Sequence, residues 1–83
     1  MSDEHYVYVL RCADDTFYTG YTTDVERRVE EHQAGQGAKY TRGRTPVELL
    51  HVESYETRSE AMSREYEIKQ LSRADKRQLT GTS

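Results

Sequence analysis

The stretch from residue 18 to residue 32 constrains the fold of this chain most strongly. It reads YTGYTTDVERRVEEH, and its aromatic and β-branched beginning is typical of a strand. Gly20 indicates either a bend of the backbone or the close approach of other atoms. Thr23 with Glu26 three residues later is a capping box, which predicts that a helix begins at about Asp24. The chain should therefore pass from strand to helix within a few residues.

The predicted helix carries polar residues close to its apolar side. At about 100° per residue, Val25 and Val29 form an apolar stripe, and Arg28 and His32 lie next to it. Arg27 points the opposite way, into solvent. Arg28 and His32 either line a cleft or extend along the stripe to reach water, and the pattern leaves both interpretations open.

The aromatic composition favours a polar site. Seven of the eight aromatic residues are tyrosines, in a chain of 83 residues with 34% hydrophobic content. A chain of this length makes one domain with a thin core, for which we expect residues 1–83 with a core of about 6–79. Tyrosine hydroxyls need hydrogen-bond partners, so some of these side chains should line a polar site.

Charge and cysteine content exclude several classes of protein. A net charge of −3 is not the basic balance of a protein that coats nucleic acid. The single cysteine, Cys12, excludes an internal disulfide and a cysteine metal cluster. No apolar run has membrane length and no signal peptide is visible, which favours the cytoplasm.

Two strands are expected before the helix. Residues 6–10 read YVYVL, a run that predicts a central strand buried on both faces. A turn near residues 14–16 should join residues 6–11 and 16–20 in an antiparallel hairpin. An odd number of loop residues would place Tyr8 and Tyr18 on the same face of the sheet, and an even number would place them on opposite faces.

A basic loop follows the helix. Gly35 predicts the end of the helix, and three glycines and a proline within residues 35–46 predict a loop. This loop has no acidic residue, and it carries Lys39, Tyr40, Arg42 and Arg44. The combination suits contacts to backbone phosphates with stacking on the tyrosine, and it equally suits a solvated flexible loop.

The C-terminal half should add one strand and two helices. Residues 47–55 read as the third strand, and Thr57 with Glu60 is a second capping box for a helix ending at about Leu71. Ser72 and Asp75 begin a short last helix that should end near residue 79. The expected order is β-β-α-β-α-α, an α+β domain with a small three-stranded antiparallel or mixed sheet flanked by helices.

One carboxylate of the longer helix stands out. Glu65 falls inside the arc spanned by the apolar residues of that helix. A carboxylate on the core side is costly unless it pairs with a cation, such as Arg28 or Lys69, or binds a metal ion. The apolar residues that define the arc are Ala61, Met62, Tyr66 and Ile68.

Taken together, these segments resemble the GIY-YIG nuclease superfamily. The resemblance rests on Tyr6-Val7-Tyr8, on Tyr18-Thr19-Gly20 about ten residues later, and on the arginine, histidine and glutamate singled out above. It is closest to the small stand-alone members and extends to the catalytic domain of the endonuclease that cuts branched DNA. Two positions depart from the pattern: Tyr6 replaces a glycine, and Gln33 replaces the asparagine of the branched-DNA enzymes.

The resemblance implies a metal-dependent endonuclease that hydrolyses phosphodiester bonds, of DNA more than of RNA, in repair or recombination. Glu65 would be the single ligand of one Mg²⁺ or Mn²⁺ ion. Tyr8 would be the general base, with its deprotonation helped by nearby cationic charge, and Tyr18 would orient water or phosphate. Arg28 would grip the phosphate, and His32 would be a second base or would hold Arg28 in place. Gly20 would allow close approach of the backbone.

The resemblance also predicts that Tyr8 and Tyr18 share a face. A non-catalytic nucleic-acid-binding or adaptor domain that retains the nuclease scaffold is the alternative, because one carboxylate makes a sparse metal site. A partner protein that supplies substrate binding fits either function.

Overall fold

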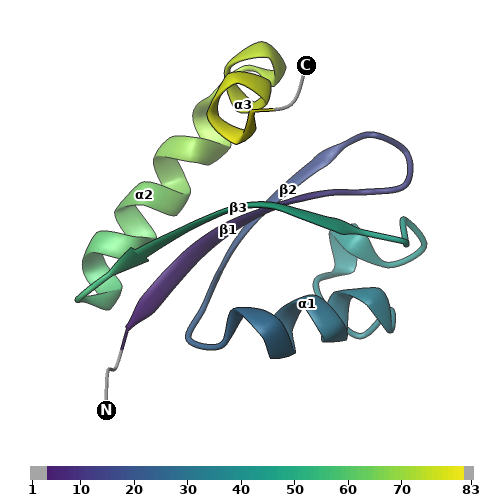
Figure 1. Ribbon diagram of the computed structural model, residues 1–83, viewed down its shortest axis with the longest axis horizontal. Helices are drawn as coiled ribbons and strands as arrows, with labels where there is room; N and C mark the ends of the chain where they lie inside the picture. The colour runs from purple at the N-terminus through teal and green to yellow at the C-terminus, as the bar shows by residue number, and fades with distance from the viewer. Residues whose placement is uncertain (1–3, 82–83) are drawn as a thin grey trace.

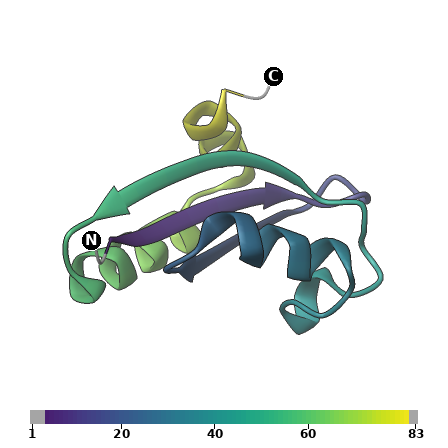
Figure 2. The same ribbon diagram turned by 60° about the horizontal axis from the view of Figure 1, so that its bottom comes forward.

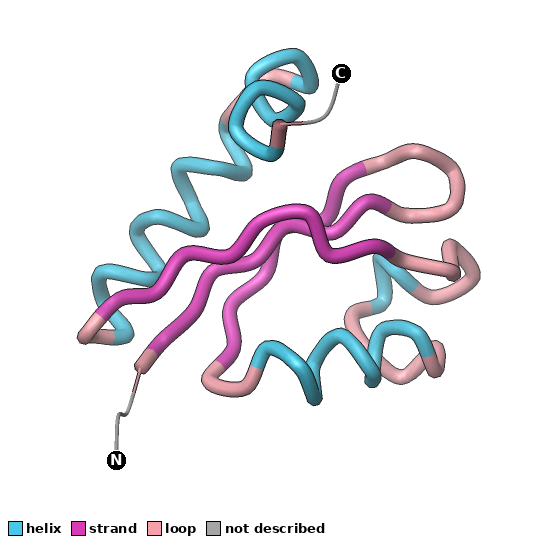
Figure 3. The backbone as a smooth tube through the Cα atoms, in the orientation of Figure 1, coloured by secondary structure: helices cyan, strands magenta, loops and turns pink. Residues whose placement is uncertain are grey.

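A three-stranded antiparallel sheet forms the centre of the molecule. The computed structural model describes residues 4–81. Its strands are β1 (His5–Arg11), β2 (Phe17–Thr22) and β3 (Glu48–Tyr55), in the spatial order β2-β1-β3 (Figure 3). Both strand pairs are antiparallel, so the mixed alternative is not found. The predicted central position of the YVYVL run is confirmed.

The helices cover the two faces of this sheet. They are α1 (Val25–Gln33), α2 (Arg58–Gln70) and α3 (Arg73–Thr80), with a single 3-10 turn, η1 (Lys39–Thr41), inside the predicted loop. The sheet runs between α1 on one side and α2 with α3 on the other (Figures 1 and 2). This is the expected α+β order with η1 added. Within residues 4–81, no helix combines the length and apolarity that a membrane span requires.

Alternate residues of β1 belong to two separate core clusters. Val7 and Val9 are fully buried against Ala61 and Ile68 of α2. Tyr8 and Leu10, which alternate with these valines, face the α1 side. There they form a second cluster with Cys12 and Val47. Cys12 is a free, buried thiol, as the sequence predicts.

The register of the hairpin decides where the tyrosines point. Tyr8 pairs with Gly20 and Leu10 pairs with Tyr18. The loop between the paired residues Arg11 and Phe17 is residues 12–16, an odd number. Tyr8 and Tyr18 therefore lie on the same face of the sheet, because directly opposite residues share a face and positions two apart along a strand do as well.

The start of α1 differs from the prediction. Its N-cap is Asp24, whose carboxylate accepts a hydrogen bond from the backbone N–H of Arg27, so the Thr23–Glu26 capping box is wrong. Thr22 accepts a hydrogen bond from the backbone N–H of Asp24, which sets the cap one residue later. The helices α2 and α3 begin as predicted, capped by Thr57 and Ser72.

The inward face of α2 is narrower than the predicted arc. Ala61 and Ile68 are fully buried, whereas Met62 and Tyr66 are 38% and 67% exposed. Of these four apolar residues, only Ala61 and Ile68, seven positions apart, are buried against the sheet. Glu65 borders this stripe, and its side chain is 14% exposed, so its inward position is confirmed.

Candidate active site

Two tyrosines from neighbouring strands form the floor of the site. Tyr8 is 1% exposed, and its ring centroid lies 6.3 Å from that of the partly buried Tyr18. Gly20 lies opposite Tyr8, and a Cβ atom there would come within 2.6 Å of Cζ of Tyr8. Strand β2 continues through Gly20 to Thr22, so this glycine provides room for the Tyr8 ring and does not end the strand.

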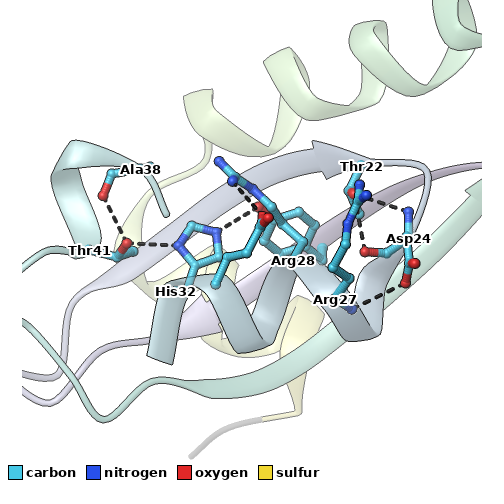
Figure 4. Close-up of polar contacts among 9 residues, drawn as sticks. Thr22, Asp24, Arg27, Arg28, His32, Ala38 and Thr41 are labelled. Carbon is cyan, nitrogen blue, oxygen red and sulfur yellow. Dashed lines mark hydrogen bonds and ion pairs between the residues drawn. The ribbon is translucent and has the colours of Figure 1, made fainter. Parts of the chain in front are cut away.

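His32 connects α1 to Tyr8 and to the loop. Its Nε2 atom lies 2.8 Å from the Tyr8 hydroxyl, and its Nδ1 atom lies 2.7 Å from the Thr41 hydroxyl (Figure 4). The side chain is fully buried. Gly37 lies against the ring, where a Cβ atom would come within 2.7 Å of Cγ. The two ring nitrogens thus contact Tyr8 and Thr41, and neither contacts Arg28.

Arg28 lies at the edge of the site, and Arg27 is exposed, as the helical pattern predicts. The Arg28 side chain is 30% exposed and donates a hydrogen bond of 3.0 Å to Glu31. Its positive charge also acts on Tyr8 and Tyr18. Arg28 therefore lies near the tyrosines while its guanidinium keeps access to solvent.

Glu65 brings one negative charge to the tyrosines from α2. Its charge acts on both Tyr8 and Tyr18, and its ion pair with Lys69 is long, at 3.8 Å. No group of three His, Cys, Asp or Glu side chains gathers as a metal site anywhere in residues 4–81. A lone carboxylate fits Mg²⁺, which keeps several waters and binds through one or two carboxylates together with substrate phosphates.

Burial sets the resting protonation of the site. Burial raises the pKa of Tyr8 to about 12, although hydrogen bonding and charge from Arg28 oppose this. Burial likewise raises the pKa of Tyr18. The pKa of His32 is lowered, first by burial and then by the charge of Arg28. At neutral pH the site therefore holds two neutral phenols and a neutral imidazole.

The basic loop is attached to this site. Tyr40 is 42% exposed and stacks on Tyr18, with ring centroids 5.8 Å apart. The guanidinium of Arg44 lies 4.4 Å from the centroid of the Tyr40 ring and also pairs with Asp14 at 2.5 Å. The remaining cations of the loop, Lys39 and Arg42, are exposed.

A pocket that the sequence did not reveal extends from these rings. It has a volume of about 360 Å³. Lys69 from α2 and Lys76 from α3 line it beside Tyr18 and Tyr40. Lys69 and Lys76 lie far from residues 35–46 in the sequence, so no local sequence pattern predicts that they share a pocket with Tyr40. Thr41 and Gly37 were also missed, because their contacts with His32 depend on how the loop folds back.

A larger groove lies elsewhere on the molecule. It occupies about 610 Å³ between α1 and β3, and the exposed Leu49 and Val52 form part of its wall. Asp24, Glu26 and Glu30 also line it. Carboxylates repel phosphates, so this groove does not suit nucleic acid.

Gln33, the departure from the branched-DNA pattern, has a structural contact. Its amide nitrogen donates to the carbonyl of Val47 at 2.6 Å, and its amide oxygen accepts from the N–H of Val47 at 2.9 Å. The side chain thereby fixes the start of β3 against the end of α1.

Comparison with known proteins identifies the family of this chain. Residues 4–78 match the GIY-YIG catalytic domain. A UPF0213 protein of Natronomonas pharaonis is 70% identical over 79 residues, covering 95% of this chain and 93% of that protein. The solution structure of a UPF0213 protein of Bacillus halodurans is 54% identical, with a TM-score of 0.61, covering 94% of this chain and 83% of that chain. An E. faecalis structure is 51% identical, with a TM-score of 0.62 and coverages of 94% and 85%. This chain belongs to the GIY-YIG catalytic domain family, a nuclease superfamily, and has small UPF0213 proteins as its relatives.

Proposed function

We propose that the chain is a divalent-metal-dependent endonuclease that hydrolyses phosphodiester bonds, of DNA more than of RNA. The observation that carries the proposal is the gathering of unlike groups around Tyr8. A neutral imidazole contacts its hydroxyl at 2.8 Å, and the charges of Arg28 and Glu65 both act on it. Phosphodiester hydrolysis needs these three elements: a proton acceptor, a cation for the phosphate and a carboxylate for a metal ion.

Each side chain has a distinct part in this mechanism. A phenol with a pKa of about 12 is not ionised at neutral pH, so Tyr8 deprotonates the attacking water as its own proton passes to His32, with the charge of Arg28 stabilising the tyrosinate. Arg28 holds the phosphate through its planar fork. Tyr18, whose ring lies 5.2 Å from that of His32, orients the water or the phosphate.

Glu65 would hold the metal ion. A bound Mg²⁺ or Mn²⁺ would supply Lewis-acid stabilisation of the oxygen that leaves. The Glu65 side chain is 14% exposed, and its only ion pair within residues 4–81 is the long one to Lys69, so the carboxylate remains available as a ligand.

Aromatic and cationic side chains beside these groups suit a nucleic-acid backbone. Tyr40 stacks on Tyr18, and Lys69 and Lys76 line the pocket next to both rings. Lys39 and Arg42 of the same loop as Tyr40 are exposed. A partner protein that delivers the substrate remains part of the proposal.

The test is a cleavage time course on labelled branched, nicked and single-stranded DNA and on RNA, in Mg²⁺, in Mn²⁺ and in EDTA. Glu65→Gln and Arg28→Lys should each lower the cleavage rate by at least about 100-fold. Their matched controls lie on the same two helices: Glu67→Gln and Arg27→Lys should retain activity. Cleavage that persists in EDTA, or that survives both site substitutions, would refute the proposal.

A nucleic-acid-binding domain without activity is the second candidate, and the near-complete burial of Tyr8 favours it. This candidate predicts salt-dependent binding of DNA by the wild-type chain with no cleavage under any of these conditions.

A further inference from the structure

The side chain of Thr41 is fully buried beneath the loop. Its hydroxyl donates a hydrogen bond of 2.9 Å to the carbonyl of Ala38, and it lies 2.7 Å from Nδ1 of His32 (Figure 4). A hydroxyl has one proton and two lone pairs. The Ala38 carbonyl also accepts the backbone N–H of Thr41, but its oxygen lies 2.9 Å from the Thr41 hydroxyl oxygen, and two oxygens this close repel unless a proton lies between them. The proton of Thr41 therefore points to the carbonyl, and its lone pairs are left for His32.

This arrangement determines which nitrogen of His32 carries a proton. A lone pair on Nδ1 would face a lone pair of the Thr41 oxygen at 2.7 Å, which is repulsive. Nδ1 must therefore carry the proton and donate it to Thr41. In a neutral imidazole the other nitrogen, Nε2, is then the acceptor.

The tautomer of His32 also fixes the direction of its hydrogen bond with Tyr8. With a lone pair on Nε2, the hydrogen bond of 2.8 Å between the two side chains has the Tyr8 hydroxyl as its donor. We propose that Thr41 is a positioning residue that holds His32 in the Nδ1–H tautomer, so that His32 can take the proton of Tyr8. The catalytic part of this inference rests on the proposed nuclease function, whereas the tautomer itself does not.

The proton transfer is balanced within the described residues. The O–H bond of Tyr8 breaks and an N–H bond forms at Nε2, which leaves a tyrosinate beside an imidazolium. The new positive charge is shared with the Nδ1–H group, which keeps its hydrogen bond to Thr41. Gly37 lies against the ring and leaves no room for it to tilt away, because even one Cβ atom there would come within 2.7 Å of Cγ.

The first experiment reads the tautomer directly. Long-range ¹H–¹⁵N correlation spectra of the histidine side chains distinguish a protonated from an unprotonated ring nitrogen. In the wild-type chain at pH 7.5, His32 should show a protonated Nδ1 and an unprotonated Nε2. Thr41→Ser should keep this pattern, and Thr41→Val, which removes the acceptor, should shift His32 toward the Nε2–H tautomer. An unprotonated Nδ1 in the wild-type chain would overturn the inference even if no variant folds.

The second experiment measures cleavage. Thr41→Val should lower kcat by about 100-fold with little change in KM, since loss of a positioned proton acceptor costs about that much. Thr41→Ser should restore kcat to within about threefold of the wild type, and the pH–rate profile of Thr41→Val should lose its dependence on His32. A tautomer shift in Thr41→Val without loss of kcat would overturn the catalytic part. Absence of cleavage by the wild-type chain would instead refute the nuclease function, and the spectra would still decide the tautomer.

Discussion

The close approach of Gly20 to Tyr8 makes Gly20→Ala the sharpest test of the site's construction. An added Cβ would lie 2.6 Å from Cζ of Tyr8 and 3.0 Å from Cε2 of Tyr18. Carbon atoms normally approach to about 3.5–4.0 Å, so the Tyr8 ring must move by about 1 Å. Gly20 lies in a β-strand without a positive φ, so backbone strain does not contribute.

The expected cost has two parts. Overpacking of a core costs about 1–3 kcal/mol. The shift also breaks the buried 2.8 Å hydrogen bond between Tyr8 and His32. Leaving those groups without partners costs about another 1–3 kcal/mol. The variant should therefore lose at least about 2 kcal/mol of unfolding free energy, which lowers Tm by at least about 8 °C in a domain of this size.

Urea denaturation followed by circular dichroism measures this loss, and Gly35→Ala is the matched control. Gly35 has a φ of +76°, and an added Cβ would meet no atom within 4 Å, so the substitution should cost only about 1 kcal/mol of backbone strain. In the Tyr8→Phe background the hydroxyl oxygen, which the added Cβ would meet first, and its hydrogen bond are both absent, so Gly20→Ala should cost at least about 1–3 kcal/mol less there. Equal costs for the two glycines, or additive costs in the double variant, would refute the reasoning.

Three further predictions concern stability. Thr19 has a buried hydroxyl without a hydrogen-bond partner among residues 4–81, so Thr19→Val should raise the unfolding free energy by about 1 kcal/mol in the same urea assay. Burial lowers the pKa of His32 from 6.5, so just below pH 6.5 the unfolded chain binds more protons than the folded chain. The unfolding free energy should therefore fall as the pH drops below 6.5. A pH series of urea titrations that shows no change in this range would contradict the prediction. Burial raises the pKa of Glu53, but hydrogen bonds from Arg64, Tyr55 and His51 outweigh burial and lower the pKa to about 2. The unfolding free energy should therefore fall by about 2–3 kcal/mol as the pH drops from 4.5 toward 2. Glu53→Gln should flatten this part of the pH series.

Local signals in the sequence predicted most of the elements. The caps at Thr57 and Ser72 depend on residues three positions apart, and the β-branched and aromatic run of β1 is continuous, so each could be recognised within a short window. The prediction at Thr23 was wrong because two adjacent residues could each cap α1, and the hydrogen bond of Thr22 to the backbone of Asp24 decides between them. The register of the hairpin required the family resemblance, because either loop parity suits the sequence.

Parts of the site could not be predicted, because they depend on contacts between distant segments. Helical periodicity placed Arg28, His32 and Glu65 on inward faces, but it does not identify what each one touches. His32 was expected either to be a second base or to hold Arg28, and its ring nitrogens contact Tyr8 on β1 and Thr41 in the loop. The pocket lysines Lys69 and Lys76 are exposed and half-buried, respectively, and a lysine on a helix carries no signal of its own for such a pocket.

The loop of residues 35–46 therefore presents two different surfaces, one to solvent and one to His32, and its composition alone does not show which residues belong to each. Tyr40, Lys39 and Arg42 are exposed and suit a phosphate backbone, which is one of the two interpretations that the sequence pattern leaves open. Gly37 and Thr41 are buried and enclose His32. A substitution of Lys39 or Arg42 should change nucleic-acid affinity and its salt dependence, with a loss of about one unit of salt slope per cation, and leave the His32 tautomer unchanged. A substitution of Thr41 should do the reverse, because its hydroxyl is buried and reaches the substrate only through His32 and Tyr8.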